Sequence, residues 1–181
     1  MVVMARKNRL VHSHIPINEV IKMTIYSNLQ QNVSKFRKLQ DEYWGDLPVK
    51  LSSFQQDLID YLGVEEKWLY TKKDKKVPVT VFGRISSESV EPVAHFLLDK
   101  DEENHALEFG VLVHLSKNGS EIVDDALMFA CNIFKKDGTY FVTVTDQVIE
   151  CQLSNDRLSF NAVFDFIVER LYMYMDPSPF E

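Results

Sequence analysis

The sequence predicts an α+β fold, in which an antiparallel β-meander of about five to six strands carries two N-terminal helices and one C-terminal helix on one face. Apolar residues recur every three or four positions from about residue 24 to about residue 63 and again after residue 159, as in amphipathic helices. Between these segments they recur every second position, as in strands that bury one face. The predicted strands are joined by short segments, so they run antiparallel.

The first helix is expected to begin at Thr24. Its apolar residues follow at spacings of three and four and form one stripe for burial. The stripe consists of Ile25, Leu29, Val33, Phe36, Leu39 and Tyr43. Gly45 is a typical helix-ending residue and Pro48 cannot continue a helix, so the helix is expected to end near Gly45.

Two further helices are expected on either side of the sheet segment. Ser53 and Gln56 have the spacing of a capping box, and Gly63 is placed to end the helix that they begin. Near the C-terminus a broad apolar face extends over residues 160–175, and Ser159 is expected at the N-terminal cap of that helix.

The strand segment has the two-residue period and the turn residues of consecutive hairpins. Six strands are predicted: Val77–Ile85, Val93–Leu98, Leu107–Leu115, Ala126–Lys135, Thr139–Thr145 and Val148–Leu153. Asn118-Gly119 and Asp137-Gly138 supply the positive φ angles of tight reversals, and Thr145–Val148 is a short polar break.

The two faces of this sheet are expected to differ. Phe109, Val111 and Val113 alternate onto one side of their strand, where the helices are expected to pack. The strand Ala126–Lys135 is apolar on both sides except for Asn132, so its second face also needs a cover. Two explanations remain for the cover of this second face. The sheet curves strongly around a pocket, or a second protein chain packs on it.

The chain divides into an N-terminal arm, residues 1–23, and a single α+β domain, residues 24–181. The arm lacks helical periodicity, and it either is flexible or is exchanged with a neighbouring copy. Met23 is an alternative start of the protein, which would make the arm an upstream extension.

Composition and charge restrict the partners. Of 181 residues, 45% are hydrophobic, and the net charge is −7. Residues 1–22 carry four basic side chains and one acidic side chain, a net charge of +3, which leaves −10 for the rest of the chain. An acidic body repels nucleic acid, and no apolar segment is long enough to cross a membrane. The two cysteines lie in apolar strands and are expected to be buried thiols, which favours a cytoplasmic protein.

Catalytic signatures are not found in the sequence, which has no nucleophile elbow, phosphate loop, dinucleotide fingerprint or zinc-protease motif. His95 and His114 lie on strands expected to pair, and Glu108 shares the face of His114, so a metal site is conceivable there. Ordinary polar residues on a half-exposed sheet are the other interpretation. Neither a cofactor nor a metal ligand set is predicted.

Two groups of candidate binding residues follow from these patterns. A pocket in a curved sheet would be lined by Phe82, His114, Ala130, Asn132 and Thr143. Consecutive Tyr and Met residues ring the end of the last helix, so some of them must be exposed or must meet another chain; Tyr172 and Tyr174 are the candidates. Phe180 adds an apolar tip to the tail that follows.

Three functions remain open. The first is a small acidic protein-interaction module without catalytic activity, of the kind found among inhibitors, immunity proteins and chaperones, which binds another protein or forms a homodimer. The second is a small-molecule-binding protein with a pocket in a curved sheet. The third is a metal-dependent enzyme that uses His95 and His114.

Overall fold

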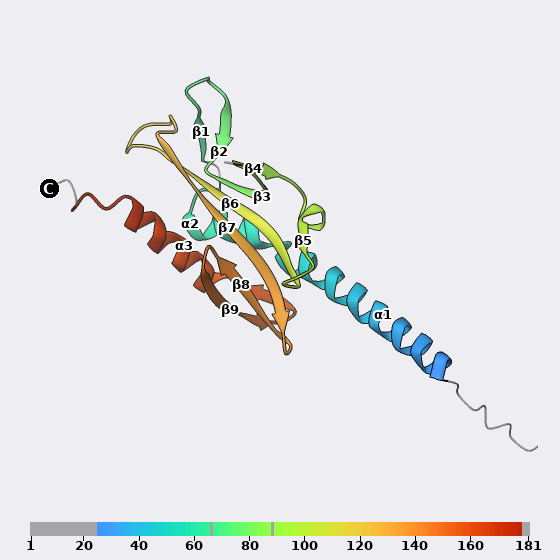
Figure 1. Cartoon of the computed structure of the whole chain (residues 1–181). Coiled ribbons are helices and arrows are strands. Elements are labelled where there is room, and N and C mark those ends of the chain that lie inside the picture. The colour runs from blue at the N-terminus through green and yellow to red at the C-terminus, as the bar shows by residue number, and fades with distance from the viewer. Residues whose placement is uncertain (1–24, 66, 88, 179–181) are drawn as a thin grey trace, which may run out of the picture. The chain divides into compact units, whose positions relative to one another are not determined.

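The computed structural model describes residues 25–65, 67–87 and 89–178 (Figure 1). The chain forms two compact units, residues 1–39 and residues 40–181. The described part of the first unit, residues 25–39, is helical throughout. The predicted arm, residues 1–23, lies outside the described residues.

Helix α1 (Ile25–Leu51) is longer than the sequence predicts, because it continues through Gly45 and Pro48. A proline inside a helix removes one hydrogen bond and costs about 3 kcal/mol. Burial of Trp44, Leu47 and Leu51 offsets this cost, since each large apolar side chain contributes about 1.5–3 kcal/mol. The predicted helix end at Gly45 is therefore wrong.

The predicted apolar stripe at the start of α1 is helical, but it is not buried. Its side chains are exposed by 50–81%: Ile25 81%, Leu29 56%, Val33 50%, Phe36 65% and Leu39 54%. Tyr43 is half-buried against the core. The periodicity predicted the helix correctly and its burial wrongly.

Helix α2 (Phe54–Leu62) ends at Gly63 as predicted, with a φ angle of 64° that favours glycine. The predicted capping box does not form. Ser53 donates to Asp57 over 2.8 Å and the Gln56 amide donates to Asp60 over 2.6 Å, so both side chains bond other side chains of the helix.

The described strands form an eight-stranded sheet and a separate two-stranded hairpin, β1 (Trp68–Tyr70) with β2 (Lys76–Pro78). The larger sheet comprises β3 (Thr80–Ser86), β4 (Ser89–Pro92), β5 (Asp99–Asp101), β6 (Ala106–Leu115), β7 (Asp125–Lys136), β8 (Thr139–Val144), β9 (Gln147–Ser154) and β10 (Arg157–Ser159). From β6 to β10 each strand pairs antiparallel with the next, which confirms the predicted meander. Strand β3 extends the sheet beyond β6, and β4 follows β3.

Two of the predicted strands are wrong in detail. Val93–Leu98 is not a strand, because residues His95–Leu97 form the short 3-10 helix η1. Val77–Ile85 is interrupted at Val79, so that its two parts join different sheets as β2 and β3. His95–Leu97 lies between β4 and β5, and Val79 lies between β2 and β3, so in both places the chain passes to a different pairing partner. Residue alternation does not predict such a change of partner.

Two of the tight turns between the later strands are formed by residues that tolerate positive φ angles. Asp137 and Gly138 have φ angles of 51° and 84°, which confirms the predicted reversal between β7 and β8. Asn155 and Asp156, with φ angles of 50° and 65°, form a further reversal before β10 that the sequence analysis missed. Asn and Asp tolerate this conformation better than most residues.

The core lies between one face of the sheet and the helices α2 and α3 (Asn161–Tyr174). Phe54 of α2 contacts the rings of Phe82, Phe109 and Phe164, with centroids 5.1–5.7 Å apart. Figure 1 shows α3 beside β8 and β9, and the two strands contact it. The predicted arrangement of helices on one face is confirmed, although Phe160 rather than Ser159 caps α3. No described helix is both long enough and apolar enough to cross a membrane.

Candidate functional site

The sheet face opposite α2 and α3 is the candidate functional site, and we call it the open face. It follows from strand alternation, because Phe109, Val111 and Val113 of β6 are buried on the helix side and the residues between them point the other way. The open face consists of Glu108, Leu112, His114, Met128, Ala130, Asn132, Phe134, Phe141, Thr143, Val148 and Glu150, on β6 to β9.

The open face carries apolar side chains along β7, with an aromatic pair near the β7–β8 turn. Phe134 and Phe141 are directly opposite in the register of β7 and β8, and their rings stack with centroids 5.3 Å apart and planes 18° apart. Both rings are half-buried, Ala130 is exposed, and Val148 is 51% exposed. Neighbouring side chains on the sheet therefore shield one another in part, and water still reaches the surface.

A polar row crosses the open face between Ala130 and the Phe134–Phe141 stack. Asn132 is in register with Glu108 on one side and with Thr143 on the other. Glu150 of β9 is opposite Phe141, so that carboxylates stand on both outer strands of the open face. Aromatic side chains together with hydrogen-bonding groups are typical of protein-binding surfaces.

The structure brings three of the predicted pocket residues together. Asn132 and Thr143 are paired, and Ala130 lies two residues along β7 on the same face. His114 lies toward the end of β6, in register with Ala126, and its Nδ1 is 2.7 Å from the main-chain oxygen of Pro78. Phe82 does not join them, because it pairs with Val111 and points into the core, where it is 6% exposed.

The predicted tyrosines at the end of α3 occupy a different surface. Tyr172 is 71% exposed. Tyr174 is 56% exposed, and its hydroxyl donates to Asp125 over 2.6 Å. This hydrogen bond raises the pKa of Tyr174 and lowers that of Asp125. Tyr174 thus ties the end of α3 to the start of β7, and Phe180 lies outside the described residues.

The hairpin expected to bring His95 and His114 together does not form. His95 lies in η1 and packs edge-on against Phe96, with ring centroids 5.5 Å apart. Glu108 and His114 share a face of β6 but are six residues apart, about 20 Å along the strand. Among residues 25–65, 67–87 and 89–178, no group of three His, Cys, Asp or Glu side chains is arranged to hold a metal ion.

Both cysteines are free and buried, as predicted. Burial raises the pKa of the Cys131 thiol far above its ordinary value. The pKa of Cys151 is raised to about 11, again mainly by burial. The neutral thiol is a weak nucleophile, so both residues act as small apolar side chains of the core.

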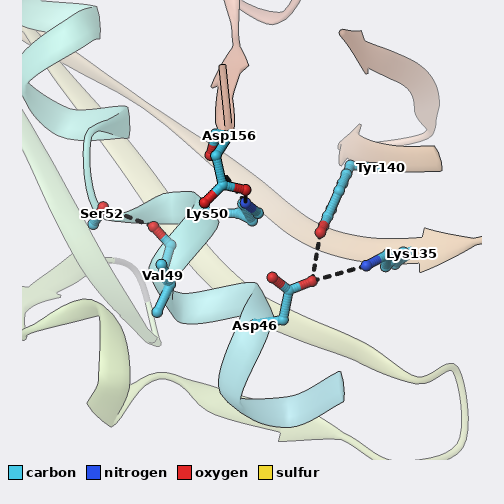
Figure 2. Close-up of polar contacts among 7 residues, drawn as sticks. All are labelled: Asp46, Val49, Lys50, Ser52, Lys135, Tyr140 and Asp156. Carbon is cyan, nitrogen blue, oxygen red and sulfur yellow. Dashed lines mark hydrogen bonds and ion pairs between the residues drawn. The ribbon is translucent and has the colours of Figure 1, made fainter. Parts of the chain in front are cut away.

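A polar cluster on the helix side joins α1 to β7, β8 and the turn before β10 (Figure 2). Asp46 accepts hydrogen bonds from Tyr140, over 2.5 Å, and from Lys135, over 3.1 Å. Burial alone would raise the pKa of Asp46, but these two hydrogen bonds outweigh it and lower the pKa. Burial and the bond to Asp46 raise the pKa of Tyr140.

Lys50 forms the second half of this cluster (Figure 2). Its side chain is 5% exposed, and Nζ donates to the carboxylate of Asp156 and, over 2.9 Å, to the main-chain oxygen of Asp156. The hydrogen bond to Asp156 raises the pKa of Lys50. Sequence reasoning missed this pair because its members are 106 residues apart and carry no local pattern. The cluster attaches the end of α1 to the sheet, and both hydrogen bonds of Lys50 go to Asp156.

Open hollows are found on the surface of the residue 40–181 unit. One of about 420 Å³ is lined by residues of α2, β10 and the start of α3. Its charged lining residues include Arg157, paired with Asp57, while Tyr61 donates to Asp165. Another, of about 350 Å³, lies along β8 and β9 and includes Tyr140 and Cys151. Neither hollow is lined by any of the residues predicted for a pocket, which are Phe82, His114, Ala130, Asn132 and Thr143.

Comparison of the chain with protein-family models, with curated proteins and with solved structures finds no match.

Proposed function

We propose that this protein is a non-catalytic protein-interaction module whose docking surface is the open face. The observation that carries the proposal is the water-accessible apolar surface on a sheet face opposite the core, where the stacked rings of Phe134 and Phe141 lie at one end of β7 and Ala130 is exposed four residues along the strand. Covering such a surface releases water from apolar groups, at about 25 cal/mol per Å² removed from solvent.

The polar residues of the open face support a protein partner. Asn132 and Thr143 offer hydrogen-bonding groups between the apolar residues Ala130 and Phe134, and two carboxylates, Glu108 and Glu150, share the face with one basic residue, Lys136, at the end of β7. Carboxylates disfavour a nucleic-acid backbone and favour a basic protein surface. We place the protein among inhibitor-, immunity- or chaperone-like binders of the cytoplasm, where two buried free thiols are ordinary.

A substitution on the open face tests this proposal. Ala130→Arg introduces a long charged side chain on the open face without disturbing the core, because Ala130 is exposed. Ala162→Arg is the matched control, since Ala162 is exposed on α3. We expect Ala130→Arg to abolish complexes seen by native mass spectrometry of protein purified from its host, and Ala162→Arg to retain them.

Two other outcomes would overturn the proposal. Complexes that survive Ala130→Arg would place the binding surface elsewhere. A monomer that carries an organic molecule or a metal ion would instead favour the pocket or the metal-dependent enzyme expected as alternatives.

A further inference from the structure

The start of α1 presents a second apolar surface, which we call the stripe: Ile25, Leu29, Val33, Phe36 and Leu39. Each of these side chains is at least 50% exposed. A helical segment of this length is marginal in water on its own, and helices of this kind gain most of their stability from packing an apolar face. We therefore expect the stripe to pack against a surface that is apolar and as long as this helical segment.

We propose that the open face of a second copy of this chain receives the stripe, and that two copies do this reciprocally. This inference rests on the proposed function, because it names the partner of the same surface. Each copy then covers the open face of the other, and the arrangement closes as a two-fold dimer with two equivalent contacts.

Charge identifies the acidic body, rather than another stripe, as the partner of the stripe. Residues 1–39 contain seven basic residues and one acidic residue, a net charge of +6. Because the whole chain has a net charge of −7, residues 40–181 have a net charge of −13. Two stripes packed on each other would bring together two such basic segments. A stripe packed on the sheet unit of another copy brings together opposite charges, which favours association and specificity.

The position of the charges agrees with this pairing at the level of single residues. Lys35 and Arg37 flank Phe36, and at 100° per residue they project to opposite sides of the stripe. On the open face Glu108 and Glu150 stand on β6 and β9, three strands apart and hence separated by about 14 Å across the sheet. A helix about 10 Å in diameter fits between these carboxylates, with one basic side chain reaching toward each.

The apolar parts also correspond in size. Residues 25–39 form about 21 Å of helix at 1.5 Å per residue. The open face extends along β7 from Met128 to Phe134, again about 20 Å at 3.3 Å per residue. The stripe can therefore lie along β7, over Ala130 and the Phe134–Phe141 stack, with the polar side chain of Asn132 between them.

Mixing two defective variants tests the reciprocal contact. Phe36→Glu breaks the stripe and leaves the open face intact, whereas Ala130→Arg breaks the open face and leaves the stripe intact. Each variant alone is expected to dimerise at least about 100-fold more weakly than the wild type, because both contacts of its homodimer are damaged. The mixture is expected to form a heterodimer of intermediate affinity, since one intact stripe meets one intact open face.

The measurement is sedimentation equilibrium of the full chain, with near-ultraviolet circular dichroism to confirm the fold of each variant. Ser34→Glu is the matched control for Phe36→Glu, because it adds the same charge about 200° away around the helix, where Ser34 is exposed. Ala162→Arg is the control for Ala130→Arg. Both controls are expected to dimerise like the wild type, and added salt is expected to weaken all dimers.

The other outcomes separate the failure of this inference from that of the proposed function. Loss of dimer with Phe36→Glu alone would indicate stripe-to-stripe pairing, and loss with Ala130→Arg alone would indicate face-to-face pairing; either overturns the reciprocal contact. A wild-type monomer that binds a different protein in an Ala130-dependent way overturns the second copy and leaves the proposed function standing. A monomer whose binding ignores Ala130→Arg overturns both.

Discussion

Replacing Asp156 by Asn removes the carboxylate that faces the buried ammonium group of Lys50. The Lys50 side chain is 5% exposed and the Asp156 side chain is 87% exposed, so the two partners of this ion pair differ in what their loss leaves behind. Asp156→Asn leaves a charge inside the protein with a weaker partner. Lys50→Met removes that charge and leaves a hydrated carboxylate at the surface.

The expected magnitudes follow from this asymmetry. A hydrogen bond to a charged group contributes about 1.5–3 kcal/mol, so Asp156→Asn should lower the free energy of unfolding by about 2 kcal/mol. Asn tolerates the φ angle of 65° at this turn position, so backbone strain adds little. Lys50→Met should change the free energy of unfolding by no more than about 1 kcal/mol, because apolar residues of similar volume replace buried ions at little cost.

Urea unfolding at pH 7, followed by tryptophan fluorescence, gives these free energies by linear extrapolation. The surface pair Lys117–Asp124 provides a control: its atoms are 3.7 Å apart and the Lys117 side chain is 83% exposed, so Lys117→Met should have no measurable effect. The pKa of Lys50 is raised in the folded protein, so its contribution is complete below about pH 10.4 and is lost as pH rises through the folded value.

The opposite order of the two variants would refute this reasoning. If Lys50→Met destabilises the protein more than Asp156→Asn, then the lysine side chain stabilises the fold through its attraction to Asp156 rather than requiring Asp156 to compensate its burial. Equal losses would mean that the two partners form an ordinary surface pair.

Three further predictions concern the same unit. Asp46→Asn should lower the free energy of unfolding by about 1 kcal/mol at pH 7. Folding lowers the pKa of Asp46, so the difference from the wild type should disappear as the pH falls below about 3.9 and through the pKa of the folded protein. Gly83→Ala should destabilise the protein by about 3 kcal/mol in thermal unfolding, because the added Cβ would lie 1.9 Å from the main-chain oxygen of Glu91. Gly45→Ala is the control and should be neutral or stabilising, because the space around Gly45 is open. Equal effects of the two substitutions would contradict the close approach of β3 and β4. Cys151, with its pKa raised to about 11, should resist an aromatic disulfide reagent at pH 8 until the protein unfolds, and rapid labelling of the native chain would show that the core opens there.

The meander was predictable because its signals are local. Asp137-Gly138 specifies a two-residue reversal, and the alternation along Ala106–Leu115 separates a buried face from an open one without any knowledge of the partners. The apolar second face of Ala126–Lys135 also predicted that the sheet needs a cover, and the open face of the structure contains three of its members, Met128, Ala130 and Phe134.

The remaining features depend on contacts that no local pattern carries. Pro48 predicts a helix end by its own chemistry, yet burial of Trp44 and Leu47 keeps the helix intact. The stripe from Ile25 to Leu39 has the periodicity of a buried face, and periodicity does not distinguish burial within the chain from burial against another chain. Phe82 was assigned to the pocket because its strand was predicted without its partner, and pairing with β6 turns it into the core.

Oxidative footprinting of the methionines tests most directly whether the open face is a docking surface. Met128 belongs to the open face, and Met173, 60% exposed on α3, is an internal reference on another surface. We predict that Met128 is oxidised more slowly in the protein assembled in its native extract than in the dilute purified chain, while the rate at Met173 stays the same. Equal rates at Met128 in both states, or protection of Met173 instead, would contradict the account.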